Sequence, residues 1–173
     1  TAPKDAVSID LTGHSLCPGF FDCHVHLSLP GTKGSPIQIA LDPPSYGYFQ
    51  LIDRLRVTLQ NGVTTARDMM GIDVGVRKAV ADGLIEGPRL LVAQNMLCQT
   101  GGHADFHLPS GIDLGPFIGA YLVDTVDAAR TRARQLLRNG VDVLKVASSG
   151  GVSSPNDDPT WLGMRRKMIA AIV

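Results

Sequence analysis

Two histidines, His24 and His26, are separated by one residue in a segment of strand-forming residues, and Asp22 stands two positions before His24. In a β-strand the side chains of residues i and i+2 project from the same face, so we expect two imidazoles and a carboxylate to converge. Burying these groups without a partner is costly, and a metal ion is one such partner because neutral imidazole is a good zinc ligand. Two unrelated histidines on a strand are the alternative, and the His-x-His spacing alone leaves both open.

The second unusual residue is Lys145, which lies near the end of the otherwise largely apolar segment from Val141 to Val146. A strand buried in a parallel sheet is normally almost entirely apolar. A lysine in that position either extends its stem so that the ammonium reaches solvent, or loses its charge on burial and becomes reactive. The segment by itself does not decide between these two roles.

Charge and composition exclude several classes of protein. The 173 residues carry 16 Lys and Arg against 16 Asp and Glu, and 44% of them are hydrophobic. This balance argues against a nucleic-acid or membrane partner, and no apolar run approaches the ~18 residues of a membrane span. Three widely spaced cysteines predict neither a disulfide scaffold nor a thiolate zinc cluster. We expect a soluble domain with reduced thiols, cytoplasmic by default; secretion stays open because Thr1 need not be the natural N-terminus.

Strands and helices alternate along the chain and must position these residues. Apolar periodicity and turn residues predict strands over 20–27, 63–66, 89–93 and 141–146, and helices over 49–60, 74–84, 125–138 and 163–173. The sequence Asn-Gly-Val follows a predicted helix twice, at 61–63 and 139–141, as expected for the second half of a βαβ unit. The alternation predicts an α/β fold with a parallel sheet and helices outside.

Two details follow from this layout. Residues 7–11 alternate between apolar and polar like an edge strand that precedes the βα series. On the first strand, Phe21, Cys23 and Val25 should face the helices, with Cys23 packed as a small apolar residue. Arg67 and Asp68 close the second strand, where we expect an ion pair or a structural role, with substrate contact as the alternative.

Four motifs stand in order over roughly residues 7–158. They are LCPGFFDCHVH at 16–26, GVTTARD at 62–68, GPRLL at 87–91 with TGGH at 100–103, and VLKV at 143–146 with SGGV at 149–152. This series closely resembles the amidohydrolase superfamily of metal-dependent hydrolases. The residues in these motifs are most similar to those of the subgroup of imidazolonepropionase-like enzymes and Xaa-Pro or acyl-amino-acid dipeptidases, which includes an ochratoxin-cleaving amidase.

The resemblance implies a TIM-like (β/α)8 barrel, here with about four βα units at 19–173, preceded by the end of a small β domain at 1–18. It implies two divalent metal ions, zinc in the first place, with His24 and His26 on the more buried ion. Lys145 would be carbamylated and bridge both ions as a catalytic ligand, and His103 would contact the substrate; exposed loop histidines at 103 and 107 are the alternative. The implied activity is hydrolysis of an amide or peptide bond in a small-molecule or dipeptide-like substrate by a metal-bridging hydroxide.

The chain is short for that barrel, which typically takes about 250 residues. No histidine follows Lys145, so the remaining histidine ligands and the acid/base aspartate have no candidates. We therefore expect the N-terminal half of a longer enzyme, inactive alone and homo-oligomeric in its full-length form. The rivals are a cyclic-amide hydrolase or deaminase of the same superfamily, and a non-catalytic fragment that acts by association. A bridging Lys145 argues against a single-metal deaminase.

Overall fold

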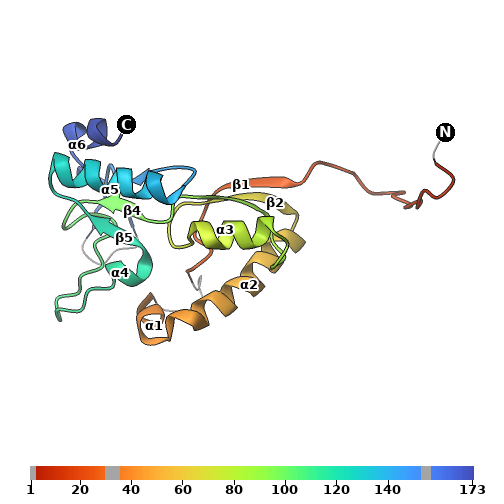
Figure 1. The fold of residues 1–173 in the computed structure, drawn as a ribbon, viewed down its shortest axis with the longest axis horizontal. Helices are drawn as coiled ribbons and strands as arrows, with labels where there is room; N and C mark the ends of the chain where they lie inside the picture. The colour runs from red at the N-terminus through yellow and green to blue at the C-terminus, as the bar shows by residue number, and fades with distance from the viewer. Residues whose placement is uncertain (1–2, 30–35, 153–156) are drawn as a thin grey trace.

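The computed structural model describes residues 3–29, 36–152 and 157–173. Strands and helices alternate through most of these ranges, and the N-terminal segment extends away from them (Figure 1). The elements in chain order are β1 (Phe20–Val25), α1 (Pro36–Leu41), α2 (Pro44–Gln60), β2 (Val63–Asp68), α3 (Val74–Ala81), β3 (Arg89–Val92), β4 (Met96–Cys98), α4 (Gly115–Ile118), β5 (Ala120–Leu122), α5 (Val126–Asn139), β6 (Lys145–Val146) and α6 (Arg166–Ile172).

The strands form two parallel three-stranded sheets, with the orders β1-β2-β3 and β5-β4-β6. The sheets follow one another along the chain because β3 ends at Val92 and β4 begins at Met96. Between them Gln94 has a φ of 65°, a left-handed conformation that interrupts the extended backbone. The predicted α/β class with parallel strands is therefore correct, whereas the single continuous sheet is not.

The longer helices begin and end where the sequence places their caps. The side chain of Thr125 accepts a hydrogen bond from the backbone N–H of Ala128 and begins α5, and Asp73 caps α3 in the same way. Gly62 and Gly140 follow α2 and α5 with φ values of 85° and 88°, which a residue with a Cβ adopts only at a cost. Both Asn-Gly pairs thus return a helix to the sheets, as predicted.

The helices cover the sheets through three buried clusters. The first joins the β1-β2-β3 sheet to α2 and α3 through residues such as Leu55, Val76 and Val92. The second surrounds β4 and β5 with α4, and the third packs α5 and α6 against β4. In α5 the buried positions Ala129, Ala133 and Leu136 follow the helical repeat that the sequence shows.

The segment from Val141 to Val146 is less regular than predicted, because only Lys145 and Val146 form a strand. Asp142 explains the difference. Its backbone N–H donates to the carbonyl of Val92, and its carboxylate accepts from the backbone N–H of Val92 and from Arg77. A side chain therefore replaces ladder pairing at this point. The short elements α1, β4, α4 and β5 were not predicted, since three to six residues carry too little periodicity.

β1 differs from expectation in its burial. Cys23 is exposed and Phe21 is 66% exposed, so the prediction that these residues lie under helices is wrong. β1 is an edge strand of its sheet, and α2 and α3 bury mainly the residues of β2 and β3. The expected strand at 7–11 is likewise absent: this described segment is exposed and pairs with no strand.

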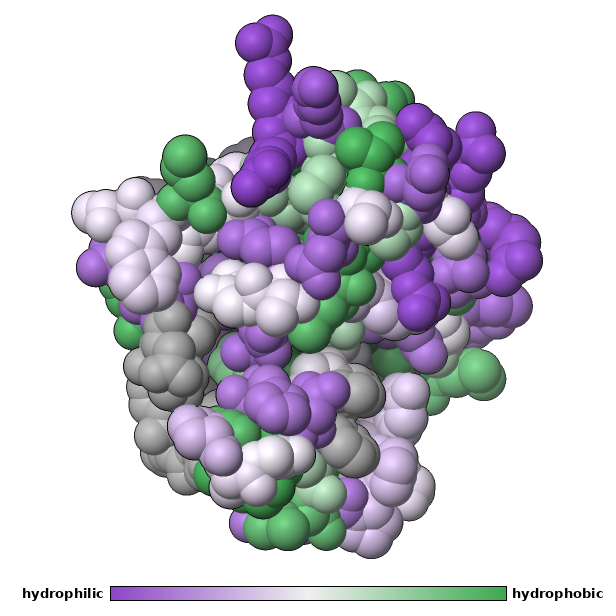
Figure 2. Space-filling model, turned by 90° about the vertical axis from the view of Figure 1, so that its left-hand side faces the viewer, coloured by the Kyte–Doolittle hydropathy of each residue, from purple (hydrophilic) through white to green (hydrophobic). Residues whose placement is uncertain are grey.

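On the face of the molecule that carries α5 and α6, the surface has no single large hydrophobic patch (Figure 2). Hydrophilic residues predominate there, and hydrophobic ones stand in several separate groups (Figure 2). Among the described residues, no helix combines the length and hydropathy that a membrane crossing requires.

Candidate metal site

The predicted histidine pair lies at the end of β1. His24 belongs to the strand, and His26 is the first residue beyond its end at Val25. The register between β1 and β2 shifts between Asp22 and Val25, so one extra residue of β1 is accommodated as a bulge. Bulges change the direction of side chains and recur beside active sites. Despite the bulge the two imidazoles meet, with ring centroids 5.3 Å apart and planes at 65°.

His26 has a backbone partner that fixes its orientation. Its Nδ1 lies 3.2 Å from the carbonyl oxygen of Met70, in the loop that follows β2. Because a carbonyl only accepts, Nδ1 carries the hydrogen and donates it. In the neutral ring this leaves the lone pair on Nε2, the arrangement found where histidine binds a metal. No sequence pattern marks Met70, since the contact uses its backbone.

Lys145 lies beside the histidines although it is far away in the sequence. It pairs with Met96 at the start of β6, and its Nζ is 3.4 Å from Nε2 of His24. The structure therefore brings His24, His26 and Lys145 together, as the sequence analysis expects. Asp22 is turned elsewhere: its carboxylate accepts a hydrogen bond from the backbone N–H of His24.

The electrostatics of this cluster disfavour positive charge. Burial lowers the pKa of Lys145, and the nearby Arg67 lowers it further. Burial also lowers the pKa of His24, with contributions from Lys145 and Arg67 that outweigh the opposing effect of Asp22. The pKa of His26 is lowered by burial, against the effect of its bond to Met70. Neutral imidazoles and a neutral amine are the forms that bind metal ions or react with electrophiles.

Arg67 and Asp68 hold the backbone around the site. Their recorded hydrogen bonds go to backbone groups and not to each other. Arg67 Nε donates to the carbonyl of Cys23, inside the bulge of β1, at 2.7 Å. Asp68 is fully buried and accepts from the backbone N–H groups of Leu27, Met70 and Ile72. Burial raises the pKa of Asp68 to about 7, although these N–H groups favour the charged carboxylate. The structural role expected for both residues is the one observed.

His103 lies at the edge of the same cluster. Its charge contributes to the lowered pKa of His26, and its Nδ1 is 2.8 Å from a carboxylate oxygen of Asp157. Asp157 is almost fully buried and also accepts from the backbone N–H of Gly151. A Cβ on Gly151 would stand 2.0 Å from Nδ1 of His103, so glycine permits this close approach. By contrast His107 is exposed.

The sequence analysis did not single out Asp157. The available signal was the Gly150-Gly151 pair, because two successive glycines also mark places where other groups approach the backbone closely. A carboxylate on Nδ1 orients an imidazole and leaves its Nε2 for a ligand. Asp157 therefore fixes the orientation of the His103 ring at the edge of the cluster.

A divalent metal ion fits part of this arrangement. His26 offers Nε2, and the Nε2 atom of His24 faces Lys145. Within the described ranges, no three His, Cys, Asp or Glu side chains form a group that could hold an ion by themselves. The two histidines thus supply two ligands, and a third from these residues requires Lys145 to become an oxygen donor.

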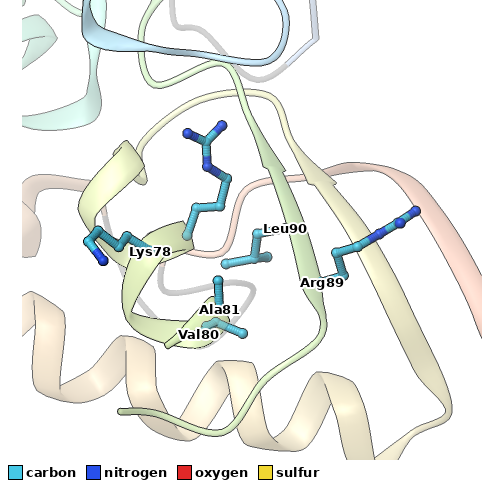
Figure 3. Close-up of a pocket in the computed structure, with 6 residues that line it drawn as sticks. Lys78, Val80, Ala81, Arg89 and Leu90 are labelled. Carbon is cyan, nitrogen blue, oxygen red and sulfur yellow. The ribbon is translucent and has the colours of Figure 1, made fainter. Parts of the chain in front are cut away.

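A separate pocket lies between α3 and β3, and its lining residues do not include those of the cluster. Its lining includes Lys78, Val80, Ala81 and Leu90 (Figure 3). Arg89 and Leu90 leave β3 in opposite directions, as alternate residues of a strand do. Lys78 forms an ion pair with Asp82 on the same surface.

The chain is similar to known proteins both in sequence and in structure. A model of the Amidohydrolase family matches residues 15–172. Ochratoxinase from Aspergillus niger is 35% identical over 177 residues, covering 91% of this chain and 36% of that protein. The crystal structure of A. niger ochratoxinase superposes with a TM-score of 0.78 at 32% identity, over 90% of this chain and 39% of that one.

A crystal structure of a prolidase complexed with N-methylphosphonate-L-proline is also similar, with a TM-score of 0.86 at 32% identity. The match covers 100% of this chain and 43% of the prolidase chain. This chain therefore spans about two fifths of the length of these relatives.

Proposed function

The chain belongs to the amidohydrolase family, and on that premise we propose that it forms the N-terminal half of a metal-dependent hydrolase of amide or peptide bonds. Its two parallel sheets would be the first part of a TIM-like (β/α)8 barrel, and residues 1–18 the end of a small β domain. The β-strands would then deliver His24, His26 and Lys145 to one end of the barrel, where active sites of this fold lie. The 173 residues alone would be inactive.

One observation carries this proposal: Nζ of Lys145 lies 3.4 Å from Nε2 of His24, across 121 residues of sequence. Chance pairing does not explain a lysine against an exposed and a half-buried imidazole, because the three groups repel one another when protonated. The arrangement is stable when all three are neutral or when an anion stands among them. Metal binding by the histidines makes the need for an anion greater.

Carbamylation of Lys145 supplies that anion. The neutral amine attacks CO2: a nitrogen–carbon bond forms, one carbon–oxygen π bond opens onto oxygen, and one proton leaves to water, so that a neutral amine becomes an anionic, carboxylate-like carbamate. The lowered pKa of Lys145 favours this step because only the unprotonated amine has a lone pair to donate. The product offers two oxygens that can each bind an ion, which is what a pair of divalent ions, zinc in the first place, requires.

The residues of this chain have separate roles in the proposed enzyme. His24 and His26 would hold one ion, a carbamylated Lys145 would supply oxygen ligands, and the carbonyl of Met70 keeps the ring of His26 in the binding tautomer. His103, held by Asp157, faces the substrate. When bound, the ions polarise the amide carbonyl and lower the pKa of water for its attack. The acid/base group and the remaining ligands would come from the other half of the enzyme.

The relatives suggest the substrate class. One of the similar proteins is ochratoxinase, and another is a prolidase that was crystallised with a phosphonate derivative of proline. We accordingly propose small amides that carry a carboxylate, either dipeptides with a C-terminal proline or N-acyl amino acids. The full-length enzyme would be a homo-oligomer.

The test uses the full-length protein and two panels of substrates, Xaa-Pro dipeptides and N-acyl amino acids. We expect hydrolysis of at least one panel, two equivalents of zinc per chain, and added mass of one CO2 on Lys145. His24→Ala and Lys145→Ala should lose metal and activity together, whereas His14→Ala, in the exposed N-terminal segment, should keep both. A metal-free His24→Ala enzyme with full activity, or an unmodified Lys145 in an active zinc-loaded enzyme, would contradict the proposal.

A further inference from the structure

His26 lies one residue beyond the last pair of the β1–β2 ladder, so strand pairing does not fix its backbone. The ladder between β1 and β2 ends at the pair Val25 and Asp68, and the backbone N–H of Met69 donates to the carbonyl of Val25 there. Among the described residues, no ladder pairing between β1 and β2 continues beyond this point. A metal ligand needs to be held within a fraction of an ångström to bind well, so another group must fix this turn.

The carboxylate of Asp68 holds the backbone N–H side of this turn, while Arg54 donates to the carbonyls of Leu27 and Ser28 on its other side. Its Oδ2 accepts a hydrogen bond of 2.7 Å from the backbone N–H of Leu27, the residue that follows His26. Its Oδ1 accepts from the backbone N–H of Met70 at 3.1 Å, and Ile72 N is 3.5 Å from the same oxygen. One side chain thus joins the turn after β1 to the loop after β2.

These contacts close a ring of bonds around His26. Asp68 holds Leu27 on one side and Met70 on the other, and the carbonyl of Met70 accepts from Nδ1 of His26. Both the backbone position of His26 and the direction of its ring are therefore set by the same buried carboxylate. Asp68 is 0% exposed, so water cannot take over its hydrogen bonds.

We propose that Asp68 is the positioning residue of the metal site: it holds His26 ready for a divalent ion by fixing Leu27 and Met70. This inference rests on the proposed function, because it assigns a purpose to the orientation of a metal ligand. Asp68 touches neither the ion nor the substrate and acts only through His26.

The chemistry requires a group that accepts hydrogen bonds on both sides. An ionised carboxylate has two oxygens and about four acceptor sites, and no hydrogen to donate. In Asp68→Asn one of the oxygens becomes an NH2 group, which would face either the N–H of Leu27 or that of Met70. Two donors then oppose each other inside the protein, the contact opens, and His26 loses one side of its support.

The experiment measures zinc affinity of the full-length enzyme by competition with a chromophoric chelator. We expect Asp68→Asn to bind zinc about ten- to a hundredfold more weakly, as is typical when a partner of a metal ligand is lost. The control is Asp142→Asn, since Asp142 also accepts a backbone N–H, that of Val92, but lies away from the histidines. This control should change zinc affinity less than threefold, even where it lowers the melting temperature.

Hydrogen exchange of the metal-free wild-type enzyme provides the second measurement and decides the matter if Asp68→Asn does not fold. The amides of Leu27 and Met70 should already be protected before zinc is added. Amides that become protected only when zinc binds would show that the ion, not Asp68, orders the turn. Zinc affinity of Asp68→Asn within threefold of wild type would overturn the positioning role alone, whereas wild-type enzyme without zinc binding would overturn the proposed function as well.

Discussion

Replacing Gly71 by alanine should destabilise the protein and disturb the site from a position that touches neither histidine. Gly71 has a φ of 113°, and a Cβ there would stand 1.9 Å from Oγ and 2.9 Å from Cβ of Ser28. The backbone conformation costs a residue with a side chain about 1 to 2 kcal/mol. Displacing Ser28 costs about 1 to 3 kcal/mol more, because its Cβ cannot move without its backbone. We expect a combined loss of about 2 to 5 kcal/mol.

A thermal unfolding experiment on the full-length enzyme measures this loss. For a full-length chain of about 400 residues, with an unfolding entropy of about 2 cal/mol/K per residue, each kcal/mol lowers the melting temperature by about 1 °C. Gly71→Ala should therefore melt about 2 to 5 °C lower, with weaker zinc binding because Gly71 follows Met70, whose carbonyl holds His26. The matched control is Gly47→Ala within α2, where a Cβ would meet no atom within 4 Å and should stabilise the helix by about 0.5 to 1 kcal/mol. Equal melting temperatures for the two variants would refute the reasoning.

Three further predictions concern packing and assembly. In the full-length enzyme, Leu136→Ala should cost about 2 to 5 kcal/mol because Leu136 is fully buried in α5, whereas Leu137→Ala, at an exposed position, should stay within about 0.5 kcal/mol in denaturant titration. In the full-length enzyme, Cys98 should react with a thiol reagent at pH 8 only after denaturation, since burial hides it and raises the pKa of its thiol; rapid labelling of Cys98 in the native state would contradict this burial. Expressed alone, the 173-residue chain should aggregate or oligomerise through exposed residues such as those of β1, and sedimentation as a stable monomer with peptidase turnover would disprove both this and the assignment as half an enzyme.

The fold could be predicted where local chemistry decides it. Helices with a repeating apolar face and a glycine at their end, such as α2 and α5, were recognised within a few residues. The break between β3 and β4 was not, because it depends on the conformation of Gln94 and on Asp142 binding across to Val92. Such long-range replacements of backbone pairing leave no periodic signal in the sequence.

The same division applies to the site. His24, His26 and Lys145 stood out because their types contradict the strands that carry them, and the structure places them together. Met70 and Asp157 did not stand out. Met70 acts through a carbonyl that every residue possesses, and Asp157 meets His103 only after two loops have folded toward each other.

The distance in sequence between His24 and Lys145 sets an order in time. At about 5 to 20 residues per second, a ribosome adds the 121 residues between them in roughly 6 to 24 s. During that interval the new chain has its histidine pair but not the lysine, so in the proposed enzyme an ion captured early would lack a ligand from Lys145. Assembly of the proposed two-ion centre would therefore wait at least for β6, and CO2 would be needed only after that strand has emerged.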